Sequence, residues 1–132
     1  MSWLHNGIEF TSEDIKNYVG FVYLITNQTN GKQYIGKKLF WAIKRKQVKN
    51  VRKRYKAESD WKEYWSSSEE LKADVQLLGK ENFTREILHL CTHKGTANYL
   101  EAREQIDRRV LESDHWYNGW IAVKVQKKHI KM

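Results

Sequence analysis

Cysteine, proline and long apolar runs are scarce or absent in this chain, and each absence excludes a class of protein. Cys91 is the only cysteine among 132 residues, and there is no proline. One cysteine excludes an internal disulfide and a Cys-rich zinc site, and its apolar surroundings favour a buried structural thiol. No apolar run approaches the roughly 20 residues that cross a bilayer. The N-terminus has no apolar stretch typical of a secretory signal, so we expect a cytoplasmic protein.

Positive charge is abundant and unevenly spread. The chain has 24 Lys and Arg against 16 Asp and Glu, and residues 37–56 contain ten basic side chains and no acidic one. Such a cluster attracts a polyanion, because neutralised phosphates release their counterions. A solvated, flexible loop is the alternative interpretation. Membrane binding would need a clean apolar helix face, which this segment lacks. The residues expected to contact nucleic acid are Lys37, Lys38, Lys44, Lys46, Arg52, Lys53 and Arg54.

The pattern of residues predicts a single α+β domain over 1–132, with a mainly antiparallel three- or four-stranded sheet flanked by helices. Residues 20–26 and 32–36 are rich in β-branched and aromatic side chains and flank Asn30-Gly31, which predicts a β-hairpin. Ser67 and Glu70 form a capping-box pattern that starts a helix ending at Gly79. The other expected elements are a short helix at 39–48, a loop at 50–58, a strand at 83–91, a helix from Thr96 to about Glu112 and a final strand at 120–125.

The hairpin contains a specific motif. Phe21-Val22-Tyr23 is followed by Tyr34-Ile35-Gly36, so its two tyrosines lie eleven residues apart, and the sequence after Tyr23 reads LITNQTNGKQYIGKK. This segment resembles the signature of the GIY-YIG nucleases, although Phe21 occupies the position of the family's first glycine. The resemblance covers roughly residues 19–123 and leaves 37–56 as a basic insert. Small stand-alone members of this kind are similar to phage-encoded proteins related to homing endonucleases, which would place this protein in the host cytoplasm.

The resemblance implies a DNA endonuclease that hydrolyses phosphodiester bonds with one Mg²⁺ (or Mn²⁺) and no small-molecule cofactor. It implies that Glu101 holds the metal, since Mg²⁺ binds through few carboxylates and keeps several waters. It also implies that one of the tyrosines is a general base, because a metal and nearby cations favour the phenolate. The residues assigned to catalysis are Tyr23, Tyr34, Arg45, Glu101 and Asn118. A catalytically inactive nucleic-acid-binding module on the same fold is the alternative function.

Several of these roles have competitors in the sequence. Lys44 is the alternative to Arg45 for holding the scissile phosphate, and Arg45 can also be one more charge in a basic run. Glu104 is the alternative to Glu101, but Arg108 lies four residues later and a surface ion pair would explain Glu104. Asn118 either contacts phosphate or makes the turn of WYNG. The two tyrosines would be ordinary strand aromatics in the absence of the other motif residues, and Lys37 is a candidate for a second phosphate contact.

Overall fold

The chain folds as an α+β structure with one mixed five-stranded sheet and a separate two-stranded sheet, as seen in a computed structural model that describes residues 2–122 and 127–129. The main sheet has the strand order β2-β1-β7-β3-β4. The α+β class is thereby confirmed. The elements are β1 (Trp3–His5), β2 (Ile8–Glu9), β3 (Gly20–Asn27), β4 (Gln33–Leu39), β5 (Trp41–Val48), β6 (Val51–Glu58), α1 (Glu69–Leu78), β7 (Phe83–Cys91) and α2 (Lys94–Asp107), with short 3₁₀ turns between them.

The predicted hairpin is confirmed as β3 and β4, the antiparallel pair at one side of the main sheet. Asn27 closes its turn, because the Oδ1 atom of Asn27 accepts a hydrogen bond of 3.0 Å from the Thr29 backbone N–H. Gly31 has a φ of 78°, a conformation that glycine adopts at little cost. In this register Tyr23 lies opposite Gly36 and Ile25 lies opposite Tyr34, so both tyrosines are on one face of the sheet.

The main sheet has more strands than the expected three or four, because the N-terminal segment joins it. β1 pairs with β7 in parallel, and β2 pairs with β1 antiparallel. Trp3 anchors this addition: its side chain is buried, and its indole N–H donates a hydrogen bond of 2.7 Å to the Trp61 carbonyl. Strands of two or three residues leave too little periodicity in the sequence to be predicted.

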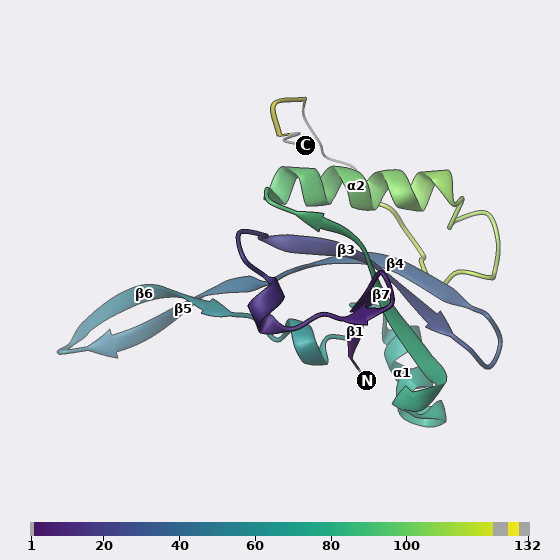
Figure 1. Cartoon of the computed structure of the whole chain (residues 1–132), viewed down its shortest axis with the longest axis horizontal. Coiled ribbons are helices and arrows are strands. Elements are labelled where there is room, and N and C mark those ends of the chain that lie inside the picture. The colour runs from purple at the N-terminus through teal and green to yellow at the C-terminus, as the bar shows by residue number, and fades with distance from the viewer. Residues whose placement is uncertain (1, 123–126, 130–132) are drawn as a thin grey trace.

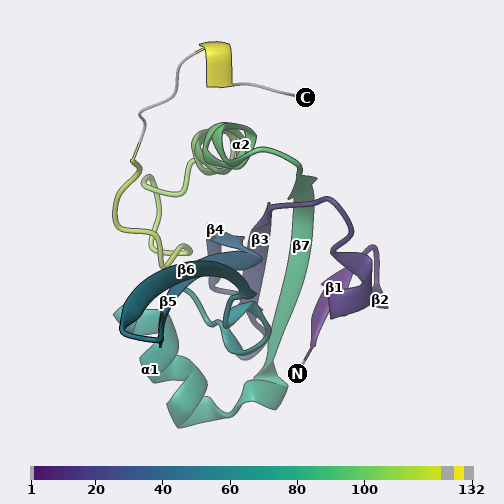
Figure 2. The same cartoon turned by 90° about the vertical axis from the view of Figure 1, so that its left-hand side faces the viewer.

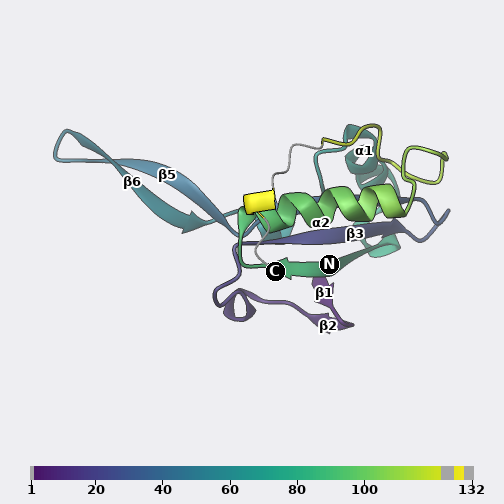
Figure 3. The ribbon, with the colours of Figure 1, turned by 90° about the horizontal axis from the view of Figure 1, so that it is seen from above.

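The expectations of a helix at 39–48 and a loop at 50–58 are wrong. The two segments form the antiparallel hairpin β5–β6, which projects from the body of the protein (Figure 1 and Figure 3). Lys49 and Asn50 connect the strands with φ values of 50° and 64°. Two successive positive φ angles are typical of a type I′ turn, whose twist matches that of the flanking strands. The basic insert is therefore an ordered ribbon.

Two clusters of apolar side chains hold the helices on opposite faces of the main sheet. Figure 1 and Figure 2 show α2 above the sheet and α1 below it. On the α2 side, Val22 and Leu24 pack with Ala97 and Leu100. On the α1 side, an aromatic cluster surrounds Leu71 and Val75 of the helix and includes Trp3, Phe21, Tyr23, Phe40 and Trp61. Each face of β3 is covered, which explains why this strand is a continuous apolar run.

The remaining boundaries agree with the sequence in part. The strand at 83–91 and the end of α1 at Gly79 are confirmed. Ser68, not Ser67, caps α1, with its hydroxyl accepting from the Leu71 N–H at 3.2 Å. α2 begins at Lys94 and ends at Asp107, earlier than expected at both ends.

The final strand expected at 120–125 is not seen. Residues 120–122 have no strand structure, and 123–126 lie outside the described residues. In the described part of the chain, no helix is long and apolar enough to span a bilayer.

Candidate active site

A cavity of about 470 Å³ opens beside β4, where the ends of several elements meet. β3 and β4 supply tyrosines from the sheet, and α2 supplies Glu101. The first turn of α1 and the segment after residue 116 complete the wall. The polar residues that line it include Tyr23, Tyr34, Lys37, Tyr64, Ser67, Glu101 and Asn118. The structure thus brings together four of the five residues assigned to catalysis.

Tyr23 and Tyr34 form a stacked pair in this cavity, with ring centroids 6.1 Å apart and an interplanar angle of 28°. Gly36 lies directly against them. A Cβ atom at Gly36 would lie 2.6 Å from Tyr23 Cζ and 2.8 Å from the Cε1 atom of Tyr34, and it would collide with the Tyr23 hydroxyl. The last glycine of the YIG motif is therefore required by the close approach of the two rings.

Tyr64 is a third tyrosine of the site, and no sequence pattern indicated a functional role for it. It hydrogen-bonds to the hydroxyl of Tyr23. Burial raises the pKa of Tyr23 well above its usual value, and the ionised forms of Tyr34, Tyr64 and Glu101 would raise that pKa further. The pKa of Tyr34 is also raised by burial, but a hydrogen bond with Ser67 acts in the opposite direction. Tyr34 is the more accessible of the stacked pair.

Besides the exposed Glu69, the cavity is lined by the carboxylate of Glu101. It is half-buried on α2, and burial raises its pKa above the usual range. The ammonium of Lys37 and a hydrogen bond to the Lys37 backbone act against this increase. A carboxylate desolvated in a cavity, with the Lys37 ammonium nearby, is the environment expected for a group that binds a cation.

Glu104, the alternative to Glu101, has a different environment. Its Oε1 atom lies 2.9 Å from the Nε2 atom of His89, and its Oε2 atom accepts from the Arg108 Nε at 2.8 Å. Burial raises the pKa of Glu104, but these two hydrogen bonds and the charges of their donors lower it below the usual range. Glu104 does not line the cavity. The ion pair with Arg108 that its sequence position suggested is confirmed.

Asn118 lines the cavity, but its side chain forms hydrogen bonds with the backbone of β4. Its Oδ1 atom accepts from the Ile35 N–H at 3.1 Å, and its Nδ2 atom donates to the Ile35 carbonyl at 2.8 Å. Gln105 donates to the same carbonyl at 3.0 Å. Just before Asn118, residues 115–117 exchange backbone hydrogen bonds with Gln33. This arrangement favours a positioning role for Asn118, which fixes the strand that carries Tyr34.

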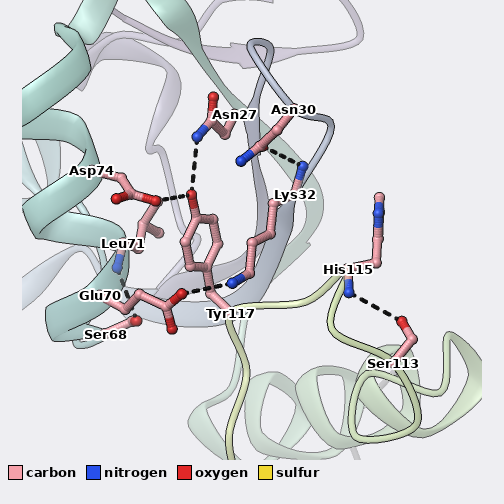
Figure 4. Close-up of polar contacts among 10 residues, drawn as sticks. All are labelled: Asn27, Asn30, Lys32, Ser68, Glu70, Leu71, Asp74, Ser113, His115 and Tyr117. Carbon is pink, nitrogen blue, oxygen red and sulfur yellow. Dashed lines mark hydrogen bonds and ion pairs between the residues drawn. The ribbon is translucent and has the colours of Figure 1, made fainter.

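Tyr117 connects α1 to the turn of the β3–β4 hairpin (Figure 4). Its hydroxyl donates to the Oδ2 atom of Asp74 at 2.6 Å and accepts from the Nδ2 atom of Asn27 at 3.0 Å. Burial and the neighbouring carboxylate raise the pKa of Tyr117 to about 12. An ion pair of 2.6 Å between Lys32 and Glu70 joins the same two elements. These contacts fix the first turn of α1 against the cavity.

Arg45 is the assigned residue that the structure does not bring to the site. It lies on β5 rather than on a helix, with its side chain exposed, and no residue of β5 or β6 lines the cavity. The same holds for Lys44, its alternative. Among the residues that line the cavity, Lys37 carries the basic side chain. Lys38 lies nearby but is engaged, 2.7 Å from Asp60 and 4.2 Å from the centre of the Tyr64 ring.

The donor atoms of the cavity fit a hard divalent cation. Two carboxylates line the cavity: the half-buried Glu101, and Glu69, which is exposed and lies 3.0 Å from the Lys72 ammonium. With the hydroxyls of Tyr34 and Ser67, all of these are oxygen ligands. Mg²⁺ prefers oxygen, needs few carboxylates and retains several waters. Within residues 2–122 and 127–129 there is no group of three or more His, Cys, Asp and Glu that would hold a metal. A metal at Glu101 would therefore rely on water and substrate for its other ligands.

Comparison with known proteins identifies a family. The family described as "Putative endonuclease segE, GIY-YIG domain" matches residues 3–121. No curated protein and no solved structure matches the chain. The match includes β1 and β2, which precede the stretch that resembled the GIY-YIG nucleases in sequence. The tyrosine pair with its glycine and the nearby Glu101 agree with this assignment, and the chain therefore belongs to the segE-type endonuclease family of the GIY-YIG nuclease superfamily.

Proposed function

We propose that this protein is a metal-dependent DNA endonuclease whose active site is the cavity beside β4. The observation that carries the proposal is the meeting of Glu101 with the stacked Tyr23 and Tyr34 in one cavity, with Lys37 beside them. An endonuclease family implies DNA as the substrate. The tyrosines and Lys37 come from the hairpin β3–β4 and the carboxylate comes from α2, so Glu101 joins the other three through the tertiary fold.

Each residue has a role that its environment supports. Glu101 would hold Mg²⁺ or Mn²⁺, which supplies Lewis-acid stabilisation of the negative charge that develops on the phosphate. Lys37 would hold a phosphate oxygen as a point charge. Tyr34 is the better candidate for the general base, because its hydroxyl is more accessible than that of Tyr23 and lies 3.4 Å from Ser67 Oγ. Tyr23 is buried and hydrogen-bonded to Tyr64, and it would position Tyr34.

The first test is nicking of supercoiled plasmid by the purified protein. We expect nicking in Mg²⁺ or Mn²⁺ and none in EDTA. A Tyr34→Phe preparation purified in parallel guards against a contaminating nuclease, because a contaminant would be equally active in both preparations. Nicking that survives EDTA would contradict the proposal. Salt-sensitive binding with no cleavage in any metal would instead support an inactive nucleic-acid-binding module.

The two tyrosines are expected to differ in their effect on rate. Tyr34→Phe should lower the nicking rate by roughly 10²- to 10⁴-fold, the usual contribution of a general base, and Tyr23→Phe should lower it less. Because burial raises the pKa of Tyr34, few phenolates are present at neutral pH, and the wild-type rate should rise between pH 6 and 9. The residual rate of Tyr34→Phe should lose this rise. A pH profile with the same slope in both proteins would exclude Tyr34 as the base.

A further inference from the structure

The projecting hairpin β5–β6 has two chemically different faces. In an antiparallel pair, residues directly opposite one another share a face, and the faces alternate along each strand. Arg45 lies opposite Arg54 and Gln47 opposite Arg52, whereas Lys46 lies opposite Lys53 and Lys44 opposite Tyr55. We call the first set the arginine face, comprising Arg45, Gln47, Arg52 and Arg54, and the second the lysine face, comprising Lys44, Lys46, Lys53 and Tyr55. All eight side chains are exposed.

The two kinds of basic residue suit different parts of a DNA duplex. The guanidinium of Arg can donate two parallel hydrogen bonds to the edge of a guanine, and the amide of Gln can bond an adenine edge in the same way. The ammonium of Lys is a compact point charge that contacts phosphate without regard to sequence. Over residues 44–47 and 52–55 the arginines lie on one face and the lysines on the other, whereas Lys56, nearer the body, is on the arginine face. The outer part of the ribbon therefore separates groups that recognise bases from groups that bind the backbone.

The charges of the hairpin require an anionic partner. Arg45 faces Arg54 and Lys46 faces Lys53 directly, and like charges in opposite positions destabilise a strand pair. The nearest acid along β6 is Glu58, at its end. That carboxylate is already bonded to the Ser12 hydroxyl at 2.6 Å and to the Trp61 indole at 2.7 Å. Asp60, two residues after the end of β6, interacts with Lys44, so the charges farther out on the ribbon favour an anionic partner outside the protein.

The dimensions of the hairpin match the major groove of B-DNA. Each strand has eight residues, which at about 3.3 Å per residue gives a ribbon roughly 26 Å long. Two strands about 4.8 Å apart, with their side chains, fit a groove about 12 Å wide but not the minor groove of about 6 Å. The deep, narrow major groove of A-form RNA excludes the ribbon.

The base of the hairpin is anchored to the body, so the ribbon has a fixed direction. The Ser59 hydroxyl donates to the Leu39 carbonyl at 2.6 Å, and the Ser59 N–H donates to the Phe40 carbonyl at 2.7 Å. Phe40 itself is fully buried in the aromatic core. Lys56 lies over the Trp41 ring, 4.9 Å from its centre, and braces the first residues of the ribbon.

From these features we infer that β5–β6 enters the DNA major groove with its arginine face against the base edges, while its lysines reach the flanking phosphates. The inference rests on the proposed function, because it takes duplex DNA as the substrate. It assigns sequence preference to Arg45, Gln47, Arg52 and Arg54, on an element separate from the cavity that would cut.

Two matched variants test this assignment. The double variant Arg45→Lys/Arg54→Lys keeps the charge of the hairpin but removes two planar guanidinium groups. The double variant Lys46→Gln/Lys53→Gln removes two charges but keeps the arginine face. Binding to a pool of duplexes with a randomised central segment is measured in EDTA, so the result does not depend on cleavage. Sequencing of the bound fraction gives the base preference, and a salt series gives the slope of log affinity against log salt. Circular dichroism confirms that both variants are folded.

The two variants should separate base preference from overall affinity. The arginine variant should lose roughly tenfold or more of the discrimination at the contacted positions, with an unchanged salt slope. The lysine variant should keep the preference and lose about 1.8 from the salt slope, the value for two phosphates. A wild-type protein without base preference, equal effects of both variants, or equal competition by double-stranded RNA would each overturn the inference. None of these results depends on whether the plasmid is nicked.

Discussion

Glu101→Gln should abolish nicking and at the same time stabilise the protein. Loss of the carboxylate removes the ligand proposed for the metal, whose contribution of several kcal/mol corresponds to a rate decrease on the order of 10³-fold. In EDTA, the melting temperature of the variant at pH 7.5 should exceed that of the wild type by roughly 1–4 °C. The reason is that burial raises the pKa of Glu101, so the folded state resists its ionisation.

The gain in melting temperature expected for Glu101→Gln depends on pH. A carboxyl group whose pKa is higher in the folded state than in the unfolded state stabilises the fold below its unfolded pKa, and the stabilisation is lost as pH rises through the folded pKa. The difference between Glu101→Gln and the wild type should therefore shrink towards pH 4. Mg²⁺ should raise the melting temperature of the wild type but not of the variant, because a ligand stabilises the state that binds it.

Glu104→Gln is the matched control, with the opposite expectation. Hydrogen bonds from His89 and Arg108 hold the pKa of Glu104 below its usual range, so its carboxylate stabilises the fold at neutral pH. We expect this variant to melt below the wild type and to retain nicking. If Glu104→Gln lost activity and Glu101→Gln kept it, the metal would have to be assigned to Glu104.

Gly36→Ala is the second large effect we expect. The added Cβ would lie 2.6 Å from the Cζ atom of Tyr23 and 2.8 Å from Tyr34 Cε1, and neither ring can move freely because both pack in the aromatic cluster. Overpacking of this kind costs about 1–3 kcal/mol, which should lower the melting temperature by roughly 5 °C or more. Displacement of the tyrosines should also lower the nicking rate by on the order of 10²-fold.

Gly119→Ala provides the comparison within the same cavity. Gly119 also lines the cavity, but a Cβ there would meet no atom within 4 Å. Its melting temperature and nicking rate should therefore be close to those of the wild type. Equal losses in the two variants would show that the close approach at Gly36 is not what constrains the tyrosine pair.

Much of the site could be predicted because its signals are local. The two tyrosines and Gly36 belong to one hairpin, whose turn residues and β-branched and aromatic side chains lie within a short stretch of sequence. The position of Arg108 favoured Glu101 over Glu104, and the structure shows the ion pair between Glu104 and Arg108. These features depend on neighbours in sequence, for which residue patterns are informative.

The features that were missed depend on contacts distant in sequence or on unusual turn residues. Tyr64 contributes to the site through its hydrogen bond with Tyr23, and residues 115–118 contribute through hydrogen bonds with the backbone of β4. Neither contact is indicated by a periodic pattern of residues in the sequence. The β5–β6 hairpin was missed because Lys49-Asn50 does not contain the glycine typical of a type I′ turn, and because charged residues dominate both strands. Arg45 was consequently expected on a helix beside the site, whereas it lies on the ribbon.

The way in which the two sheets end has a consequence for self-association. An unpaired strand edge is a template on which a second chain can add by backbone hydrogen bonding, and proteins prevent this by covering the edge or charging it. At β4 the edge is covered by backbone bonds to Gln33 and by the Asn118 amide on Ile35. At β5–β6 charge alone protects the edges, and salt screens charge but not hydrogen bonds. Concentrated salt in the absence of DNA is therefore the condition in which this protein would first aggregate, and it would do so through its ribbon.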